Sequence, residues 1–287
     1  MKLARSTAAA LLVPWLAAVA AAVVTAAPAR AEQLPLWEAG LGGAALSFPD
    51  YRGSNERQLW LLPFPYLVYR GEFLQADERR MRGVFFKTER AELDLSFNGS
   101  VPVDSDDNDA RRGMPDLDGT LEIGPSLNLK LAETAGGKTQ VELRLPARAV
   151  LASDFSYVRQ VGWVFQPNIS VDVRDPLGHA GWKLGVLAGP IFSDQRYHRY
   201  FYEVAPAFAT AARPAYTPGG GYAGTQLIAA LSKRYREFWV GGFVKWDTLH
   251  GAAFEDSPLV KDRQGFAAGF SIAWVLGESK KMVEATR

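Results

Sequence analysis

The chain has 287 residues with 32 basic and 31 acidic side chains, and it contains no cysteine. The balanced charge argues against a nucleic-acid-binding protein, which needs a clustered basic surface. Without cysteine, a disulfide scaffold and a cysteine-ligated zinc site are excluded. Because no low-complexity linker divides the chain, we expect one large domain rather than two small ones.

The first residues have the three parts of a secretory signal. Lys2 and Arg5 precede an apolar run over 8–27, and Ala29-Arg30-Ala31 offers small residues for a signal peptidase before the sequence turns polar. A retained transmembrane anchor is the alternative, since the run approaches the roughly 20 residues that a spanning helix needs. We expect cleavage after residue 31. Removing three basic residues and no acid leaves 29 basic against 31 acidic side chains, a net charge of −2.

The dominant pattern of the remaining chain is an alternation of apolar and polar residues. It is clearest over 91–98, 121–131, 141–149 and 163–174. Because side chains of a strand point to opposite faces in turn, each segment has one apolar and one polar face. Thirteen strands are predicted in chain order, at 36–48, 58–69, 71–77, 82–87, 90–102, 119–131, 138–152, 158–174, 182–193, 197–205, 222–234, 237–248 and 264–276.

The length of these segments favours a barrel in a membrane over a soluble sandwich or barrel. They run about 10–14 residues, which suits a tilted membrane crossing. Bulky aromatic residues near their ends suit interfacial girdles: Trp37, Tyr66, Tyr69, Trp163, Trp182, Trp239, Trp246 and Trp274. The sequence therefore predicts an all-β protein, a closed antiparallel transmembrane β-barrel in the outer membrane. The barrel domain spans 32–287, with strands to about 277 and a charged tail at 278–287.

The strand count sets the side on which each connection lies. Bacterial single-chain barrels have an even number of strands, so we interpret 71–77 and 82–87 as one bent strand, which gives about 12. Counting back from a last strand that ends in the periplasm, the long connections 206–221 and 250–263 fall outside. On the same count, 103–118 falls in the periplasm.

Two prolines interrupt the strand predicted over 61–69. Proline removes a ladder donor and is normally confined to edges or bulges. A bulge that curves the wall, a seam in the barrel and a constriction of its lumen all remain open.

Five short motifs stand in order along the chain. They are WEAGLGG with PDYRGS at 37–54, LPFPY with YRG at 62–71, RGMPDLD leading to EIGP at 112–125, AY before glycines at 215–221, and DSPLV at 256–260. In this order they resemble the MltA-interacting protein (MipA/OmpV) family of outer-membrane proteins. The likeness runs from Trp37 to about Leu276, nearly the whole mature chain.

This resemblance implies a non-catalytic outer-membrane barrel. The founding member of the family is similar to a scaffold that brings a lytic transglycosylase together with a bifunctional peptidoglycan synthase. A passive, porin-like channel for small solutes is the alternative, because the inner face carries charged and small residues. An outer-membrane lipid hydrolase is a third. The family defines no catalytic residues, and we expect no cofactor and no metal.

The residue chemistry agrees with a non-catalytic protein. The three histidines, His179, His198 and His250, are interpreted as surface or interfacial residues, and no Gly-x-Ser-x-Gly or His-Glu-x-x-His motif occurs. The acidic run 104–109 has the oxygen density of a calcium loop but lacks the glycine and closing glutamate of an EF-hand, so a solvated loop is favoured.

Outer-membrane lipids and lipopolysaccharide are the expected surroundings. A basic and aromatic group could contact lipopolysaccharide phosphates, although an interfacial anchor is the favoured interpretation. It consists of Arg196, Tyr197, Arg199 and Tyr200.

The connection 103–118 is the predicted docking site for the cell-wall enzymes. It combines charges that would steer a partner with two apolar anchors. The predicted contact residues are Asp104, Asp106, Asp107, Asp109, Arg112, Met114, Asp116, Leu117 and Asp118. An ion-paired plug or turn built from Arg112, Asp116 and Asp118 is an equal alternative.

Overall fold

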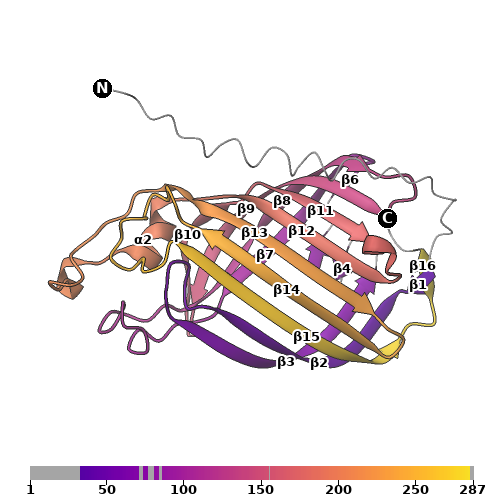
Figure 1. Ribbon diagram of the computed structural model, residues 1–287, viewed down its shortest axis with the longest axis horizontal. Helices are drawn as coiled ribbons and strands as arrows, with labels where there is room; N and C mark the ends of the chain where they lie inside the picture. The colour runs from indigo at the N-terminus through magenta and orange to yellow at the C-terminus, as the bar shows by residue number, and fades with distance from the viewer. Residues whose placement is uncertain (1–32, 71–73, 77–80, 84–85, 155, 285–287) are drawn as a thin grey trace.

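One antiparallel sheet of fourteen strands dominates the computed structural model, which describes residues 33–70, 74–76, 81–83, 86–154 and 156–284 (Figure 1). Its strands are β2 (Trp37–Pro49), β3 (Arg57–Arg70), β4 (Leu74–Ala76), β5 (Met81–Gly83), β6 (Phe86–Lys87), β7 (Ala91–Ser100), β8 (Gly119–Glu133), β9 (Thr139–Ser153), β10 (Val158–Phe165), β11 (Asn168–Arg174), β12 (Trp182–Ser193), β13 (Gly221–Arg234), β14 (Phe238–Thr248) and β15 (Gln264–Glu278). The other elements are a ribbon of β1 (Gln33–Pro35) and β16 (Met282–Glu284), the helix α2 (Gln195–Tyr202), and the short 3-10 turns η2 (Pro176–Gly178) and η3 (Pro206–Phe208).

The sheet follows the chain with few departures. Its order is β5-β4-β3-β2-β15-β14-β13-β12-β10-β9-β8-β7-β6. Both β10 and β11 pair with β9 and β12, so they are halves of one strand and the sheet has about thirteen strand positions. The two ends of the sheet are β5 and β6, which are neighbours in the chain, and β5 lies beside β7. The predicted all-β, antiparallel class is confirmed.

One predicted strand is a helix. The segment 197–205 was predicted as a strand, but 195–202 forms α2, and the carboxylate of Asp194 caps it by accepting the N–H of Tyr197 at 2.9 Å. Three side chains at helical spacing, His198, Phe201 and Tyr202, are buried on one face. No helix among the described residues is both long and apolar enough to span a membrane.

The predicted merger of 71–77 with 82–87 is also wrong for the described parts of these segments. Leu74 pairs with Gly83 and Ala76 with Met81, so β4 and β5 are two strands of a hairpin. The predicted strand that made the count odd was therefore the helical segment 197–205, and not one of this pair.

The connections divide between two ends of the sheet (Figure 1). The loop end carries the four long connections 50–56, 101–118, 194–220 and 249–263. The turn end carries the short turns 134–138, 175–181 and 235–237 and the β1–β16 ribbon. The connection 103–118 was predicted opposite to 206–221 and 250–263, yet it lies at the same end. Because α2 replaces a predicted strand, one crossing is lost, and the connections between β6 and α2 change sides. The split of 71–77 from 82–87 adds a crossing, so the connection 50–56 keeps its side.

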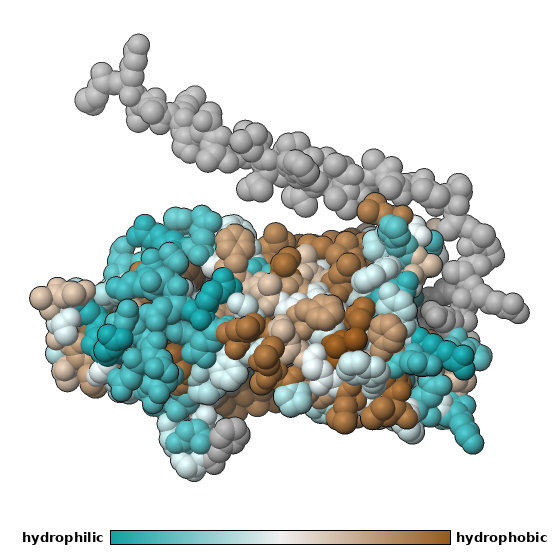
Figure 2. All heavy atoms as spheres, turned by 60° about the horizontal axis from the view of Figure 1, so that its bottom comes forward, coloured by the Kyte–Doolittle hydropathy of each residue, from teal (hydrophilic) through white to brown (hydrophobic). Residues whose placement is uncertain are grey.

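The two faces of the sheet differ as the alternation predicts. Figure 2 shows an apolar band around the middle of the molecule, with hydrophilic surface at both ends. Its outward residues include Leu41, Leu59, Leu61, Leu67, Leu121, Leu131, Val244, Phe266, Phe270 and Leu276. Buried polar residues of the opposite face include Glu38, Asp94, Glu122, Asn128, Arg148, Asn168, Gln226 and Asp247.

Two of the aromatic residues predicted for the girdles face the interior instead. Tyr66 and Trp239 are buried, and their ring centroids lie 6.1 Å apart. Trp37, Trp163 and Trp274 are exposed, as girdle residues require.

Within the described part of the chain, the proline-containing strand β3 is paired on one side only over most of its length. Its register with β2 runs without a shift from Tyr69 to Arg57, so the strand has no bulge toward β2. On the other side β4 pairs only with Tyr69 and Arg70, which leaves 57–68 without a ladder partner among the described residues. Pro63 and Pro65 therefore have no described strand on that side, where a missing N–H costs no described ladder bond. Of the three alternatives for these prolines, a bulge toward β2 is excluded by the register, whereas a seam beside β3 is consistent with it.

Residues 282–284 of the predicted charged tail form strand β16 of the ribbon. Gln33 of β1 pairs with Glu284 of β16, which brings the two ends of the described chain together. The predicted signal peptide lies outside the described residues.

Candidate functional site

The four long connections pack on one another at the loop end, and we call this assembly the loop cap. Its apolar residues are Tyr51, Val103, Ala110, Leu117, Phe201, Tyr202, Val204, Leu249, Ala252, Phe254 and Leu259. The same cluster continues onto Val150 and Ala152 of β9 and Ile191 of β12. Since buried residues of the strands and of the loops form one core, the cap packs directly against the loop end of the sheet.

Hydrogen bonds between the connections hold the cap together. The Tyr51 hydroxyl donates to the Leu259 carbonyl at 2.8 Å, and the Tyr202 hydroxyl donates to the Arg52 carbonyl at 2.9 Å. The Ser257 hydroxyl donates to the Tyr202 carbonyl at 2.8 Å. Residues more than 50 positions apart in the sequence are thus joined directly.

The two predicted apolar anchors of the docking site are used inside the cap. Leu117 is buried in the apolar cluster, and Met114 packs against it. Two acids of the same segment also have internal partners: Asp116 accepts the N–H of Ser105 at 2.8 Å, and Asp118 accepts the Tyr157 hydroxyl at 2.8 Å. These residues therefore shape the cap.

The remaining predicted contact residues are exposed. They are Asp104, Asp106, Asp107, Asp109 and Arg112. Arg112 is paired with Asp109, while Asp116 and Asp118 bind other groups. The alternative of an ion-paired turn within the segment is thus found for Arg112, but with a different acid.

Arg111 is a structural residue that the sequence analysis missed. It is buried, and its guanidinium donates to the Ser105 hydroxyl at 3.1 Å, the Phe201 carbonyl at 3.2 Å and the Pro115 carbonyl at 2.8 Å. Burial lowers the pKa of Arg111, because all of these partners are uncharged. Nothing in the local sequence separates this arginine from the exposed one that follows it.

The prediction for His198 is wrong. It was interpreted as a surface or interfacial residue, but its side chain is fully buried. Its Nδ1 lies 2.6 Å from the Gly219 carbonyl, and its ring packs edge-on against Phe254. Burial lowers the pKa of His198, and the positive charge of Arg52 lowers it further. Both effects favour the neutral form of the histidine in the cap.

The basic and aromatic group predicted at 196–200 lies on α2. Tyr197 and Tyr200 pack against the cap core, while Arg196 and Arg199 are exposed. Burial raises the pKa of Tyr200 to about 12, and its hydroxyl donates to the Asp118 carbonyl at 3.3 Å. The tyrosines thus anchor the helix to the core of the loop cap.

A second, smaller cluster lies at the turn end. Glu38 is 3% exposed and accepts hydrogen bonds from Arg70 at 2.7 Å and Arg234 at 2.6 Å. The Tyr66–Trp239 pair lies in an apolar cluster with Val68, Ala273, Phe64 and Val275. We call the three charged residues the Glu38 cluster.

Between the two ends, the interior wall is charged and internally bonded. Arg148 donates to Glu122 at 2.8 Å, to Ser96 at 3.2 Å and to Gln166 at 2.5 Å. Ser96, Glu122 and Arg148 come from β7, β8 and β9, and Gln166 directly follows β10. This network satisfies buried polar groups, and it also supplies the polar inner surface that a channel would need.

One comparison with known proteins identifies a family. The family model described as MltA-interacting protein MipA matches residues 41–276. No curated protein matches the chain. Among solved structures, the chain is similar to the P. putida toluene transporter TodX, with 9% identity, coverage of 86% of this chain and 68% of that one, and a TM-score of 0.25. The family match confirms the resemblance drawn from the sequence motifs.

Proposed function

The chain belongs to the MltA-interacting protein family MipA, and from this premise we propose that it is a closed outer-membrane β-barrel that acts as a non-catalytic scaffold for peptidoglycan-remodelling enzymes. The family description names an interaction and not a reaction. The partners that we propose are a lytic transglycosylase and a bifunctional peptidoglycan synthase.

The ends of the sheet support closure of the barrel. The strands β5 and β6 stand at the two ends of the sheet order and follow one another in the chain. If they form one strand, and β10 with β11 form another, the fourteen strands become twelve, an even number as bacterial barrels have. Closure would also remove the unpaired ends of the sheet.

The lengths of the connections support one orientation. Outer-membrane barrels have short periplasmic turns and longer exterior loops. We therefore place the turn end in the periplasm and the loop cap outside. The predicted docking residues in 104–118 would then meet an exterior partner, so the surface for cell-wall enzymes belongs to the turn end.

The packing of both ends is the observation that carries the choice of a scaffold over a channel. The loop cap has a buried apolar core at one end, and the buried Glu38 cluster and Tyr66–Trp239 pair lie at the other. A passive pore needs a continuous water-filled path. The channel remains the second candidate because of the charged wall around Arg148.

An exposed leucine at the turn end is the proposed anchor for the partner. Leu177 is 97% exposed, and it and Asp175 adopt left-handed backbone conformations with φ of 54° and 52°. Such conformations are strained for residues other than glycine. The Asp175 carboxylate accepts the Gly181 N–H at 2.6 Å, which holds the turn in this shape. An apolar side chain presented on a rigid turn suits a protein partner.

A binding experiment with purified proteins tests the scaffold. We expect a purified lytic transglycosylase to bind the detergent-solubilised barrel and Leu177→Asp to weaken that binding at least tenfold. Thr134→Asp, another exposed position at the same end, is the control. Equal binding by both variants would remove Leu177 as the anchor. Absence of binding by the unaltered barrel, together with a steady single-channel conductance, would replace the scaffold by the pore.

A further inference from the structure

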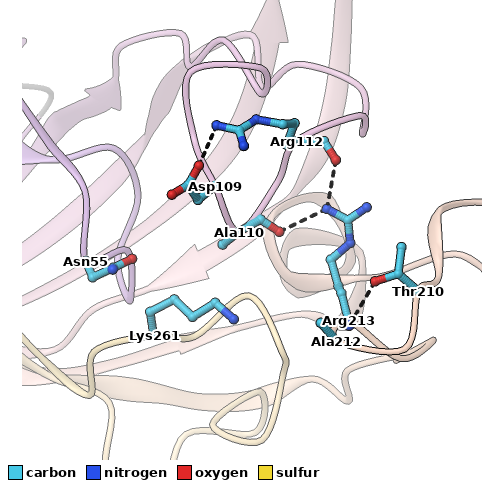
Figure 3. Close-up of a pocket in the computed structure, with 8 residues that line it drawn as sticks. All are labelled: Asn55, Asp109, Ala110, Arg112, Thr210, Ala212, Arg213 and Lys261. Atoms are coloured by element: carbon cyan, nitrogen blue, oxygen red, sulfur yellow. Dashed lines mark hydrogen bonds and ion pairs between the residues drawn. The ribbon is translucent and has the colours of Figure 1, made fainter.

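A cavity in the loop cap lies where all four long connections meet. Its volume is about 400 Å³, and Figure 3 shows its lining. The lining residues are Asn55 from 50–56, Asp109, Ala110 and Arg112 from 101–118, Thr210, Ala212 and Arg213 from 194–220, and Lys261 from 249–263. A cavity of this size holds a small ligand or one sugar-sized group of a larger one.

The charged residues of this cavity are mostly basic. Three cations, Arg112, Arg213 and Lys261, stand against one carboxylate, that of Asp109, which leaves a net charge of +2. The Glu56 carboxylate is a further acid beside the lining, since it accepts the Asp109 N–H at 2.8 Å. A local excess of cations at a concave site favours an anionic ligand.

Arg213 is fixed without being neutralised. Its Nη1 donates to the Ala110 carbonyl at 3.0 Å and the Arg112 carbonyl at 3.1 Å, and its Nε and Nη2 donate to the Phe208 carbonyl at 3.3 Å and 2.9 Å. Carbonyl oxygens orient a guanidinium but carry no net charge. The full positive charge of Arg213 therefore acts on the cavity.

The other two cations are available to a ligand. The backbone of Lys261 is held by the Gly53 carbonyl at 2.7 Å, and Figure 3 shows its side chain extending between Asn55 and Arg213. Arg112 is paired with Asp109, but both side chains are largely exposed, at 65% and 76%. An exposed ion pair contributes little free energy, so Arg112 is free to exchange its partner.

We propose that this cavity binds a phosphate group carried by the sugar of a surface glycolipid, the phosphorylated glucosamine disaccharide of lipopolysaccharide being the source that fits its exterior position. Lys261 and Arg213 would supply the charge. Arg112 would supply the paired donors that match phosphate oxygens, and the Asn55 amide would bind a neighbouring sugar hydroxyl. The assignment to a glycolipid rests on the proposed orientation, whereas the phosphate site itself does not.

Titration of the purified barrel in detergent tests the site. The probes are lipid A with its phosphates, dephosphorylated lipid A and inorganic phosphate. We expect Lys261→Gln to weaken binding of phosphorylated lipid A about tenfold, as loss of one charge-assisted hydrogen bond does. Lys261→Arg should retain it, and binding should weaken with added salt. Lys138→Gln, which removes the same charge from an exposed position at the turn end, should bind like the unaltered barrel.

The outcomes distinguish two questions, whether the cavity binds phosphate and whether a glycolipid carries that phosphate. Equal affinity for phosphorylated and dephosphorylated lipid A, or no effect of Lys261→Gln, would overturn the phosphate site. Inorganic phosphate that binds as tightly as lipid A would support the phosphate site and overturn the glycolipid as its ligand. If phosphorylated lipid A binds as expected but the loop cap faces the periplasm, the proposed orientation is wrong and the phosphate site is still supported.

Discussion

The rings of Tyr202 and Phe254 stack face to face, with centroids 3.7 Å apart and an interplanar angle of 8°. Both side chains are buried, and they come from different connections, 194–220 and 249–263. His198 packs edge-on against Phe254 from the same helix as Tyr202. One aromatic contact therefore joins the helix to the loop that precedes the last long strand, which makes Phe254 the central residue of the loop cap.

Phe254→Ala should loosen the cap while the sheet stays folded. Deleting a fully buried phenylalanine costs about 3–5 kcal/mol, and here the loss falls on the cap. We expect faster backbone hydrogen exchange over 249–263 with an unchanged heat-modifiable migration on gels. Phe266→Ala, at an outward and exposed position of β15, is the control and should leave that exchange unchanged. Equal exchange in both variants would contradict a central role for Phe254.

The cap should weaken as the pH falls below about 6.5. Burial lowers the pKa of His198 in the packed cap, so the opened cap binds a proton that the packed cap cannot. Since the opened state then takes up more protons, the free energy of cap opening decreases as the pH falls from the unperturbed histidine pKa of about 6.5 toward the lowered value. Arg52 and Asp194 are the charged groups that act on this ring.

The measurement is hydrogen exchange of 194–220 at pH 7.5 and pH 5.5. The fraction of time that the cap is open should rise at the lower pH in the unaltered protein but not in His198→Gln. This window lies above the range of Glu255, whose pKa is lowered by the Gly251 N–H that its carboxylate accepts. A His198→Gln variant with the same pH dependence as the parent would show that another group titrates.

Glu38→Gln should destabilise the turn end strongly. The carboxylate is buried between two arginines, and removing one partner of a buried ion pair costs about 3–5 kcal/mol. Glu133→Gln, which removes the acid of a partly exposed pair with Lys130, should cost at most about 1 kcal/mol. The denaturant midpoint of the detergent-solubilised barrel measures both changes. Equal shifts of the denaturant midpoint in Glu38→Gln and Glu133→Gln would show that Glu38 is solvated rather than buried.

Replacing both Pro63 and Pro65 by Val should create an edge that pairs. The substitutions add two N–H donors to a strand whose 57–68 segment has no ladder partner among the described residues. Open edges with free donors pair with other chains. We expect cross-linked dimers in detergent, with a denaturant midpoint close to that of the parent. A monomer with a much lower midpoint would show that the prolines face a neighbouring strand.

Cysteine labelling tests the proposed orientation directly, because the sequence has no native cysteine. Asp107→Cys lies exposed at the loop end and His179→Cys lies exposed at the turn end. In intact cells a membrane-impermeant maleimide should label the first variant, and it should label the second only after the outer membrane is opened. The reverse pattern would place the loop cap in the periplasm and restore 104–118 as a site for cell-wall enzymes.

Strand positions followed from the sequence because the direction of a side chain along a strand is a local property. The alternation over 91–98 and 121–131 predicted β7 and β8 with errors of a few residues at their ends. The family motifs were equally local. Pro63 and Pro65 predicted an irregular strand, but the sequence left a bulge, a seam and a constriction open. Only the unbroken register with β2 excluded a bulge toward that strand.

Tertiary packing decided which face and which end each residue occupies. Tyr66 and Trp239 resemble girdle residues in sequence because an aromatic ring suits a lipid interface and a buried core alike, and the pairing of their strands turned them inward. The segment 197–205 carries both an alternating and a helical pattern. The Asp194 cap and the burial of His198 against Phe254 favour the helix. That helix removes one crossing, and because sides alternate with each crossing, it moved the segment 103–118 to the loop end.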